Sequence, residues 1–407
     1  MSSGRTIEIV PVRQHRAASA AIGVVPAPPL SLYVHLPWCV RKCPYCDFNS
    51  FEQGGEGVPE DRYLAALTAD LERALPEVWG RSVRSVFIGG GTPSLFAPES
   101  IDRLLAMIRA RLQVLPGAEV TMEANPGTFE AQRFKAFAQA GVTRLSVGVQ
   151  SFSDQALAAL GRVHDGAQAR RALEVAATHF AGFNVDLMYA LPGQSLADCA
   201  RDLTEALAFE PPHLSFYHLT IEPGTAFATH PPAVPDEDLA ADMQAMIEER
   251  LGAAGLLRYE VSAYARRARR CEHNLNYWQF GDYLGIGAGA HGKISFADRI
   301  VREQRFRNPQ RYMDAALAGD AVEASRVLTR DDLVFEFMLN ALRLVEGVPL
   351  AMFARHTGLE PGEMASELRL ARARGLLDED RETLRATELG RRFMNDLQQI
   401  FLRADVG

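Results

Sequence analysis

The chain has 407 residues, of which 47% are hydrophobic and 23% are charged, and its formal net charge is −8. This length is enough for one large barrel and a smaller second domain. The acidic balance gives no general attraction to nucleic acid or anionic membranes, and no apolar run approaches the roughly 20 residues that a membrane-spanning helix needs.

The first 29 residues contain scattered arginines and end in a Pro/Ala-rich stretch, VPAPP at 25–29. They lack the continuous apolar segment and small-residue cleavage site of a secretory signal. We therefore expect residues 1–29 to form a loosely ordered lead-in.

From residue 30 onward, short apolar runs alternate with amphipathic segments, a pattern typical of βα units around a parallel sheet. The expected strands are 32–36, 83–88, 119–123, 144–149, 182–188 and 213–219. The helices expected between them are 59–75, 98–112, 129–140, 166–179 and 196–209. Six successive strands predict an α/β fold with a partial (β/α)6 TIM-like barrel over 30–235, whose site lies at the carboxyl ends of the strands.

Three of the five cysteines, Cys39, Cys43 and Cys46, form a C-x3-C-x2-C loop directly after the first expected strand. An odd number of thiols without a secretory signal favours a metal or redox site over a disulfide framework. A structural zinc ion would need a fourth ligand, for which His35 and Asp47 are the local candidates. Three thiolates also suit a cubane iron-sulfur cluster with one open iron, although the spacing matches neither ferredoxin pattern.

Polar or glycine residues follow the next expected strands. The segment GGGTP at 89–93 would let backbone approach a ligand where a side chain would clash, although alone it also fits a tight turn. Glu123 ends the third strand, where the alternative is a solvated acid. Gln150 follows a nearly all-apolar strand, and a buried amide there would need a polar partner.

Asp186 lies inside the fifth expected strand among apolar neighbours, where an unpaired carboxylate would be unfavourable. Arg162 is its expected partner, either in a structural salt bridge or in the polar lining of a cofactor site. Cys199, in the helix that follows, is expected to be a small buried packing residue.

From about residue 329 the pattern changes to helices, expected at 331–344, 349–356 and 361–374. A hairpin at 375–387 and a last helix at 388–402 complete a winged-helix-like domain over 329–407, which leaves 236–328 as an extension of the barrel. The helix at 361–374 mixes acids with bases and the wing is acidic, so we expect packing or partner docking rather than DNA binding.

The cysteine loop, with aromatic Tyr45 before its last cysteine, resembles the cluster loop of radical SAM enzymes. The resemblance implies a [4Fe-4S] cluster on Cys39, Cys43 and Cys46, with the amino and carboxylate groups of S-adenosylmethionine on the open iron. Over residues 30–402 the chain is similar to the oxygen-independent coproporphyrinogen III dehydrogenase branch of that superfamily. The positions that match its cofactor-site pattern, besides Tyr45, are Tyr33, His35, Gly90, Gly91, Thr92, Glu123, Gln150, Arg162 and Asp186.

Two kinds of protein share this pattern. The decarboxylating enzyme has a fourth cysteine where this chain has Phe48, and a longer N-terminal arm whose arginines reach the propionates. The segment CEHNLNYW at 271–278 contains H-N-x-x-Y-W and resembles the haem-chaperone type. There His273 would offer an imidazole to haem iron, and Tyr277 and Trp278 would supply flat surface for a macrocycle. Alternatively, His273 is a packed or capping residue, and His291 is a weaker candidate ligand.

The resemblance thus implies a cytoplasmic haem chaperone that binds haem, a [4Fe-4S] cluster and S-adenosylmethionine and passes haem to a recipient haemoprotein. A membrane-associated respiratory enzyme is one class of recipient, and nucleic acid is not an expected partner. The alternative is the coproporphyrinogen III dehydrogenase, which abstracts hydrogen from two propionates and releases carbon dioxide. A third interpretation is a winged-helix regulator that carries a redox cluster.

Overall fold

The computed structural model describes residues 23, 25–55 and 57–403. Most of the expected lead-in at 1–29 therefore lies outside the described residues. Its last part runs against the sheet: the Val25 N–H donates to the Ala297 carbonyl at 3.4 Å, and the Pro29 carbonyl accepts from the Asp282 N–H at 2.9 Å.

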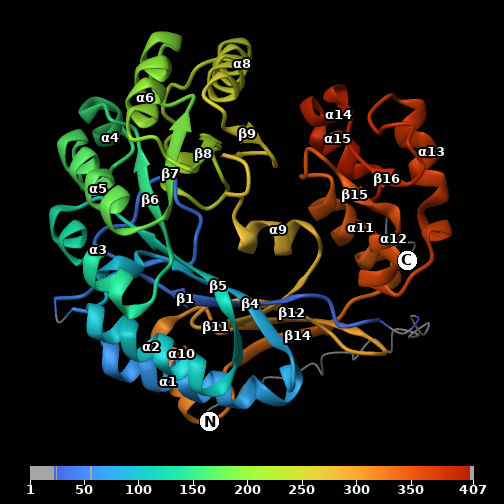
Figure 1. The fold of residues 1–407 in the computed structure, drawn as a ribbon, viewed down its shortest axis with the longest axis horizontal. Coiled ribbons are helices and arrows are strands. Elements are labelled where there is room, and N and C mark those ends of the chain that lie inside the picture. Colours follow the sequence, from blue (N-terminus) through green and yellow to red (C-terminus); the bar gives the residue numbers. More distant parts are fainter. Residues whose placement is uncertain (1–22, 24, 56, 404–407) are drawn as a thin grey trace, which may run out of the picture.

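One open sheet of 12 strands forms the centre of the molecule (Figure 1). Its middle consists of six parallel strands in chain order, β1 (Leu30–Leu36), β4 (Ser82–Gly90), β5 (Gln113–Ala124), β6 (Arg144–Gln150), β7 (Gly182–Tyr189) and β8 (His213–His218). The connecting helices are α1 (Glu60–Ala74), α2 (Pro98–Arg111), α3 (Thr128–Ala140), α4 (Asp154–Ala159), α5 (Gly166–His179) and α6 (Leu196–Ala208). This confirms the predicted α/β fold with a partial barrel.

Local sequence signals explain why these elements form where they do. In β1, Leu32, Val34 and Leu36 are 0% exposed on one face. On the other face Ser31 and His35 are 1% and 5% exposed, as expected for a parallel strand covered on both faces. Helix α5 begins with a capping box, in which Asp165 accepts from the Gln168 N–H at 2.7 Å and the Gln168 side chain accepts from the Asp165 N–H at 2.9 Å.

The sheet continues beyond both ends of this parallel core. β11 (Asp282–Ile286) pairs with β1 in parallel, and β12 (His291–Ser295), β13 (Ile300–Arg305) and β14 (Val322–Val327) add antiparallel strands. At the other end, β10 (Ala263–Ala265) and β9 (Leu257–Arg258) follow β8. The prediction of six strands missed these additions, because the glycine-rich stretch around β11 lacks the β-branched run that marks a strand.

Further helices follow β8 in the chain. They are α7 (Ala226–Thr229), α8 (Glu237–Ala253), α9 (Glu272–Trp278) and α10 (Pro309–Leu317). Of these, α8 packs against α6 and α10 against α1. Helix α9 carries the H-N-x-x-Y-W motif and contacts β1, β4 and β11, so the motif lies over the strands that precede the cysteine loop and the glycine run.

The C-terminal part is helical and has its own apolar cluster, which also includes residues between 259 and 300. Its elements are α11 (Arg330–Ala341), β15 (Val348–Pro349), α12 (Leu350–Thr357), η3 (Pro361–Met364), α13 (Ala365–Ala373), β16 (Thr383–Leu384), α14 (Glu388–Arg392) and α15 (Met394–Gln399). The continuous last helix predicted at 388–402 is wrong, because Phe393, with φ −112° and ψ 48°, separates two short helices.

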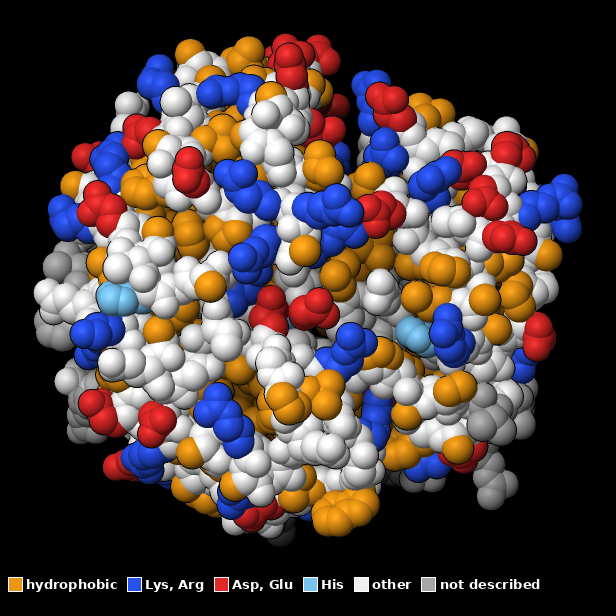
Figure 2. Space-filling view, viewed as in Figure 1, with side chains coloured by type: hydrophobic (Ala, Val, Ile, Leu, Met, Phe, Trp, Pro, Cys, Tyr) orange, Lys and Arg blue, Asp and Glu red, His pale blue; other side chains and the backbone are white. Residues whose placement is uncertain are grey.

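In the space-filling view, basic and acidic side chains are interspersed over the visible face, and a furrow separates the C-terminal helices from the barrel at the top (Figure 2). Within the described part of the chain, no helix is both long and apolar enough to cross a membrane.

Candidate functional site

The cysteine loop is closed at its base by a small pair of strands. β2 (Trp38–Cys39) lies parallel to β3 (Phe51–Glu52), and the Cys46 N–H donates to the Cys43 carbonyl at 3.1 Å inside the loop. The three thiols are free and half-buried. The loop therefore gathers three cysteines at the carboxyl end of β1, as the spacing predicts.

Each of the three sulfur atoms has one side-chain hydrogen-bond partner. Thr92 Oγ1 donates to the Cys39 sulfur at 3.5 Å, and the Arg162 guanidinium donates to the Cys43 sulfur at 3.6 Å. The Ser50 hydroxyl lies 3.8 Å from the Cys46 sulfur. Burial raises the pKa of the Cys39 and Cys46 thiols, whereas donors aimed at sulfur favour the thiolate that binds iron.

Asn125 joins two of these donors into one network. Its amide nitrogen donates to Thr92 Oγ1 at 2.9 Å, and its Oδ1 accepts from the Arg162 guanidinium at 2.5 Å. Arg162 also donates to the Gly148 carbonyl at 2.8 Å. Sequence reasoning missed Asn125, although it lies two residues after Glu123 at the end of a strand, where a polar residue is a functional signal.

The predicted salt bridge between Arg162 and Asp186 is wrong, whereas their alternative role in the polar lining of a cofactor site stays a prediction. Arg162 is directed to the cysteine loop, as described above, whereas Asp186 accepts from the Ser146 hydroxyl at 2.7 Å and from the Asn184 amide at 2.7 Å. Asn184 lies two residues before Asp186 on β7, and Ser146 is its partner on β6. Neutral donors on the same face of the sheet therefore satisfy the buried carboxylate, and burial raises its pKa.

The glycine run accommodates the cysteine loop itself. A Cβ on Gly91 would lie 2.5 Å from the Trp38 carbonyl oxygen, and one on Gly90, whose φ is 118°, would lie 2.7 Å from the His35 ring. The Gly91 and Thr92 N–H groups donate to the carbonyls of residues 36 and 38. A carbonyl oxygen of this segment would accept a hydrogen bond from an ammonium group, and the Thr92 carbonyl already accepts one from the Leu95 N–H at 3.0 Å.

His35 is held between the first strand and the end of the cysteine loop. Its Nδ1 lies 2.8 Å from the Tyr33 hydroxyl and its Nε2 lies 2.9 Å from the Asn49 carbonyl oxygen. Burial lowers its pKa to about 4. The Asn49 amide in turn donates to the carbonyls of Ala288 at 3.0 Å and Arg307 at 2.9 Å, which fastens the loop to the sheet extension.

Neither local candidate, His35 or Asp47, is placed to be the fourth ligand of a closed zinc site. Both nitrogens of His35 are engaged and Asp47 is exposed. Across the described residues, no three His, Cys, Asp or Glu side chains converge closely enough to hold a single metal ion. Three thiols without a fourth protein ligand, each beside a donor, fit a cluster that leaves one iron open.

Glu123 and Gln150 lie at the ends of neighbouring strands. Glu123 accepts from the Gly90 N–H at 3.0 Å, and burial, with a smaller contribution from Asp186, raises its pKa to about 7. Gln150 has φ 67°, a left-handed conformation that is uncommon outside glycine and is found preferentially at functional sites. Tyr45 packs against Phe227 with ring centroids 6.3 Å apart, and burial raises its pKa.

The side chains of the H-N-x-x-Y-W motif project from α9 toward two different parts of the molecule. The His273 ring stacks on Phe87 with centroids 4.4 Å apart, and its Nδ1 is buried without a partner in the described part of the chain. Burial lowers its pKa to about 4. Tyr277 and Trp278 instead line a hollow between the sheet extension and the C-terminal helices, which His273 does not line.

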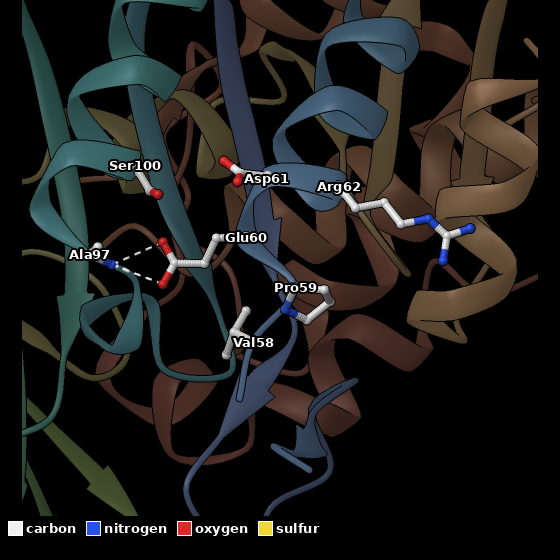
Figure 3. A pocket seen from close by; sticks show the side chains of 7 residues that line it. All are labelled: Val58, Pro59, Glu60, Asp61, Arg62, Ala97 and Ser100. Atoms are coloured by element: carbon white, nitrogen blue, oxygen red, sulfur yellow. Dashed lines mark hydrogen bonds between the residues drawn. The ribbon is translucent and has the colours of Figure 1, made fainter. Parts of the chain in front are cut away.

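A second hollow, of about 530 Å³, lies at the start of α1 and α2 (Figure 3). There both carboxylate oxygens of Glu60 accept from the Ala97 N–H at 3.1 Å, which holds the two helix starts together. None of the predicted site residues lines this hollow, and we assign it no ligand.

Comparison with known proteins identifies the family. Residues 33–206 match the radical SAM superfamily, and residues 328–393 match the HemN C-terminal domain. Over 381 residues the chain is 48% identical to the heme chaperone HemW of Escherichia coli (strain K12), covering 93% of this chain and 100% of that protein. This chain belongs to the HemW family of radical SAM proteins.

Other relatives agree with this assignment. The heme chaperone HemW of Haemophilus influenzae (strain ATCC 51907 / DSM 11121 / KW20 / Rd) is 44% identical over 92% of this chain and 98% of its own length. The solved structure of coproporphyrinogen III oxidase (HemN) from Escherichia coli superposes with a TM-score of 0.79 at 24% identity, covering 92% of this chain and 90% of that one. That structure shows the shared fold.

Proposed function

We propose that this chain is a haem chaperone, which binds haem and passes it to a recipient haemoprotein. The observation that carries the proposal is the 48% identity to the heme chaperone HemW of Escherichia coli over that protein's whole length. Phe48, which is exposed, supports the same function. The decarboxylating enzyme has a further cysteine at this position.

In this proposal, Cys39, Cys43 and Cys46 hold a [4Fe-4S] cluster, and S-adenosylmethionine occupies the open iron. When bound, the cluster supplies an electron for cleavage of the sulfonium. The protein's own contribution is electrostatic: Thr92, Arg162 and the Ser50 hydroxyl lie against the three sulfurs and stabilise their anionic form.

The remaining predicted cofactor residues would form the rest of the S-adenosylmethionine site. Carbonyls of the segment from Gly90 to Thr92 would accept from the ammonium group of S-adenosylmethionine, and Glu123 would accept from its ribose hydroxyls or face its sulfonium. Gln150 and Asp186 would line the same site from β6 and β7. Tyr33 holds His35 in place below the glycine run.

We also propose that haem transfer takes place in the cytoplasm, and that a membrane-associated respiratory enzyme is one class of recipient. Tyr277 and Trp278 belong to the haem-binding part of the chain. The mixed charges of α13 and the acidic wing support docking of a protein partner on the C-terminal helices rather than nucleic acid.

The test uses anaerobically reconstituted full-length protein in two assays on one sample. Haem titration followed by Soret absorbance should show saturable binding. Incubation with S-adenosylmethionine, reductant and coproporphyrinogen III should give no protoporphyrinogen IX. Formation of that product would favour the dehydrogenase alternative, and absence of saturable haem binding would overturn the chaperone function.

A further inference from the structure

The hollow that Tyr277 and Trp278 line has a volume of about 830 Å³. Its walls come from α9, from β11 to β14, from α11 and from the end of the described chain. This volume lies within the range of small-molecule sites, which are typically clefts of about 300–1,000 Å³. It is separate from the cysteine loop, because no loop residue lines it.

One wall of the hollow is aromatic, with the Trp278 ring almost perpendicular to that of Tyr277, at 82°, and the Tyr283 ring tilted by 34°. Tyr277 lies between Trp278, with centroids 5.2 Å apart, and Tyr283, with centroids 4.9 Å apart. Two leucines at the rim are unusually exposed for apolar residues, Leu339 at 37% and Leu402 at 56%. A surface of this kind suits a large and partly apolar ligand whose edges contact the aromatic rings.

The Arg343 guanidinium, which lines the hollow, has N–H donors that are not fully hydrogen-bonded. The Arg343 guanidinium lies over the Trp278 ring at 4.2 Å and reaches Glu260 only at 3.4 Å. Arg343 Nε and Trp278 Nε1 are both buried without a partner in the described part of the chain. Unpartnered buried donors are unfavourable, so these two N–H groups would favour an anionic group on the ligand.

The other two arginines of the hollow are already paired. Arg302 forms a 2.6 Å ion pair with Glu336, and Arg326 lies 3.0 Å from Asp332 and 2.9 Å from Glu336. Arg343 is therefore the residue whose charge is least compensated, which places the anion-binding end of the hollow at Trp278.

The hollow also contains an imidazole. His291, the first residue of β12, lines it and is exposed, and no hydrogen bond of its side chain occurs within the described residues. Partial desolvation by the surrounding walls, together with the charges of Arg302 and Arg307, lowers its pKa, which favours the neutral form that coordinates metals. His273, by contrast, is stacked on Phe87 outside the hollow.

We propose that haem binds in this hollow, with His291 as the iron ligand and with Arg343 and the Trp278 N–H at one propionate. This assignment rests on the proposed chaperone function and adds the position and the ligand. A flat macrocycle that carries both a metal and carboxylates satisfies the aromatic wall, the free imidazole and the unpartnered donors together.

Haem titration of the reconstituted full-length chain tests the assignment. In His291→Ala, the Kd for haem should rise at least tenfold and the Soret maximum should move, because the axial ligand is lost. In Ala324→Trp, a bulky side chain from the exposed strand β14 fills the hollow, and saturable binding should disappear. His179→Ala, at the exposed end of α5, is the matched control and should bind like the wild type.

The outcomes separate the two levels of the proposal. If the wild type itself shows no saturable haem binding, the chaperone function fails. If the wild type binds haem but both His291→Ala and Ala324→Trp keep its affinity and spectrum, the site assignment alone is overturned. A Soret shift in His273→Ala and not in His291→Ala also overturns the ligand assignment. Should His291→Ala fail to fold, Ala324→Trp decides.

Discussion

Replacing Glu123 by Gln should make the protein more stable and, under the proposed function, less able to bind S-adenosylmethionine. Glu123 is half-buried at the end of β5, and desolvation raises its pKa from 4.5 to about 7. Gln has nearly the same shape, and its amide oxygen can still accept from the Gly90 N–H. The substitution therefore removes the charge while it retains the local hydrogen bond.

The sign and size of the effect follow from proton linkage. Because the folded protein holds this proton more tightly than the unfolded chain, Glu123 favours folding most below pH 4.5, and its contribution falls as the pH rises through about 7. At about 1.4 kcal/mol per tenfold change in proton affinity, Glu123→Gln should exceed the wild type by about 1.4 kcal/mol at pH 5.5 and by about 3 kcal/mol at pH 8.5.

Thermal unfolding of the cluster-free protein measures this difference. An unfolding entropy of about 2.1 cal/mol/K per residue makes 1 kcal/mol worth about 1 °C in a chain of this size, so the Tm difference should grow from about 2 °C to about 4 °C between the two pH values. Glu249→Gln removes a charge from an exposed face of α8 and should change Tm by less than about 1 °C.

A constant Tm difference across this pH range, or a variant less stable than the wild type at both pH values, would refute the role given to burial of Glu123. S-adenosylmethionine affinity, measured on the reconstituted protein, is a separate readout. Its loss in a more stable variant would show that Glu123 is retained for binding at a cost in stability.

Three further substitutions test the site and its support. Gly91→Ala should destabilise the chain by about 1–3 kcal/mol, because its Cβ would meet the Trp38 carbonyl at 2.5 Å. It should also lower the amounts of iron and sulfide bound per chain. Gly55→Ala, which has open space around it, is the control and should bind iron normally. Asn125→Ala should speed loss of the cluster in air relative to the wild type, because Thr92 and Arg162 lose their link, and an unchanged rate of bleaching would contradict the network. Asp282→Asn should lower Tm by about 4–6 °C, because it removes the carboxylate that lies 2.8 Å from the buried Lys293 ammonium. A buried charge left without its partner costs about 3–5 kcal/mol. A Tm shift below about 1 °C would refute this role of Asp282.

Sequence patterns predicted the parallel core because its strands carry apolar runs and the longer connecting helices have a regular apolar stripe, whereas the short helix α4 was not predicted. They also placed the cysteines, Glu123 and Gln150 at strand ends, since the carboxyl ends of parallel strands share one edge of the sheet. The glycine-rich strand β11 was missed because pairing with β1, and not local propensity, makes it extended, and β12 to β14 follow it as successive antiparallel neighbours.

The error about Arg162 has a different physical origin. Charge complementarity suggested Asp186 as its partner, but a sequence does not show which side chain a loop residue can reach. Ser146 and Asn184 satisfy the carboxylate across neighbouring strands, and Arg162 is then available to the cysteine loop. Asn184, two positions before Asp186 on the same face of a strand, was the signal that could have corrected this prediction.

The amide of Asn49 links the cysteine loop to the turn between β11 and β12, so that the two segments constrain each other. It bonds to the Ala288 carbonyl, and Ala288 lies only three residues before His291. Assembly of iron on the loop would therefore restrict the same turn that carries the imidazole, so that ordering one centre lowers the entropy still to be lost at the other. Under the proposed function, haem affinity would then depend on whether the cluster is assembled, and the iron-free chain would bind haem more weakly.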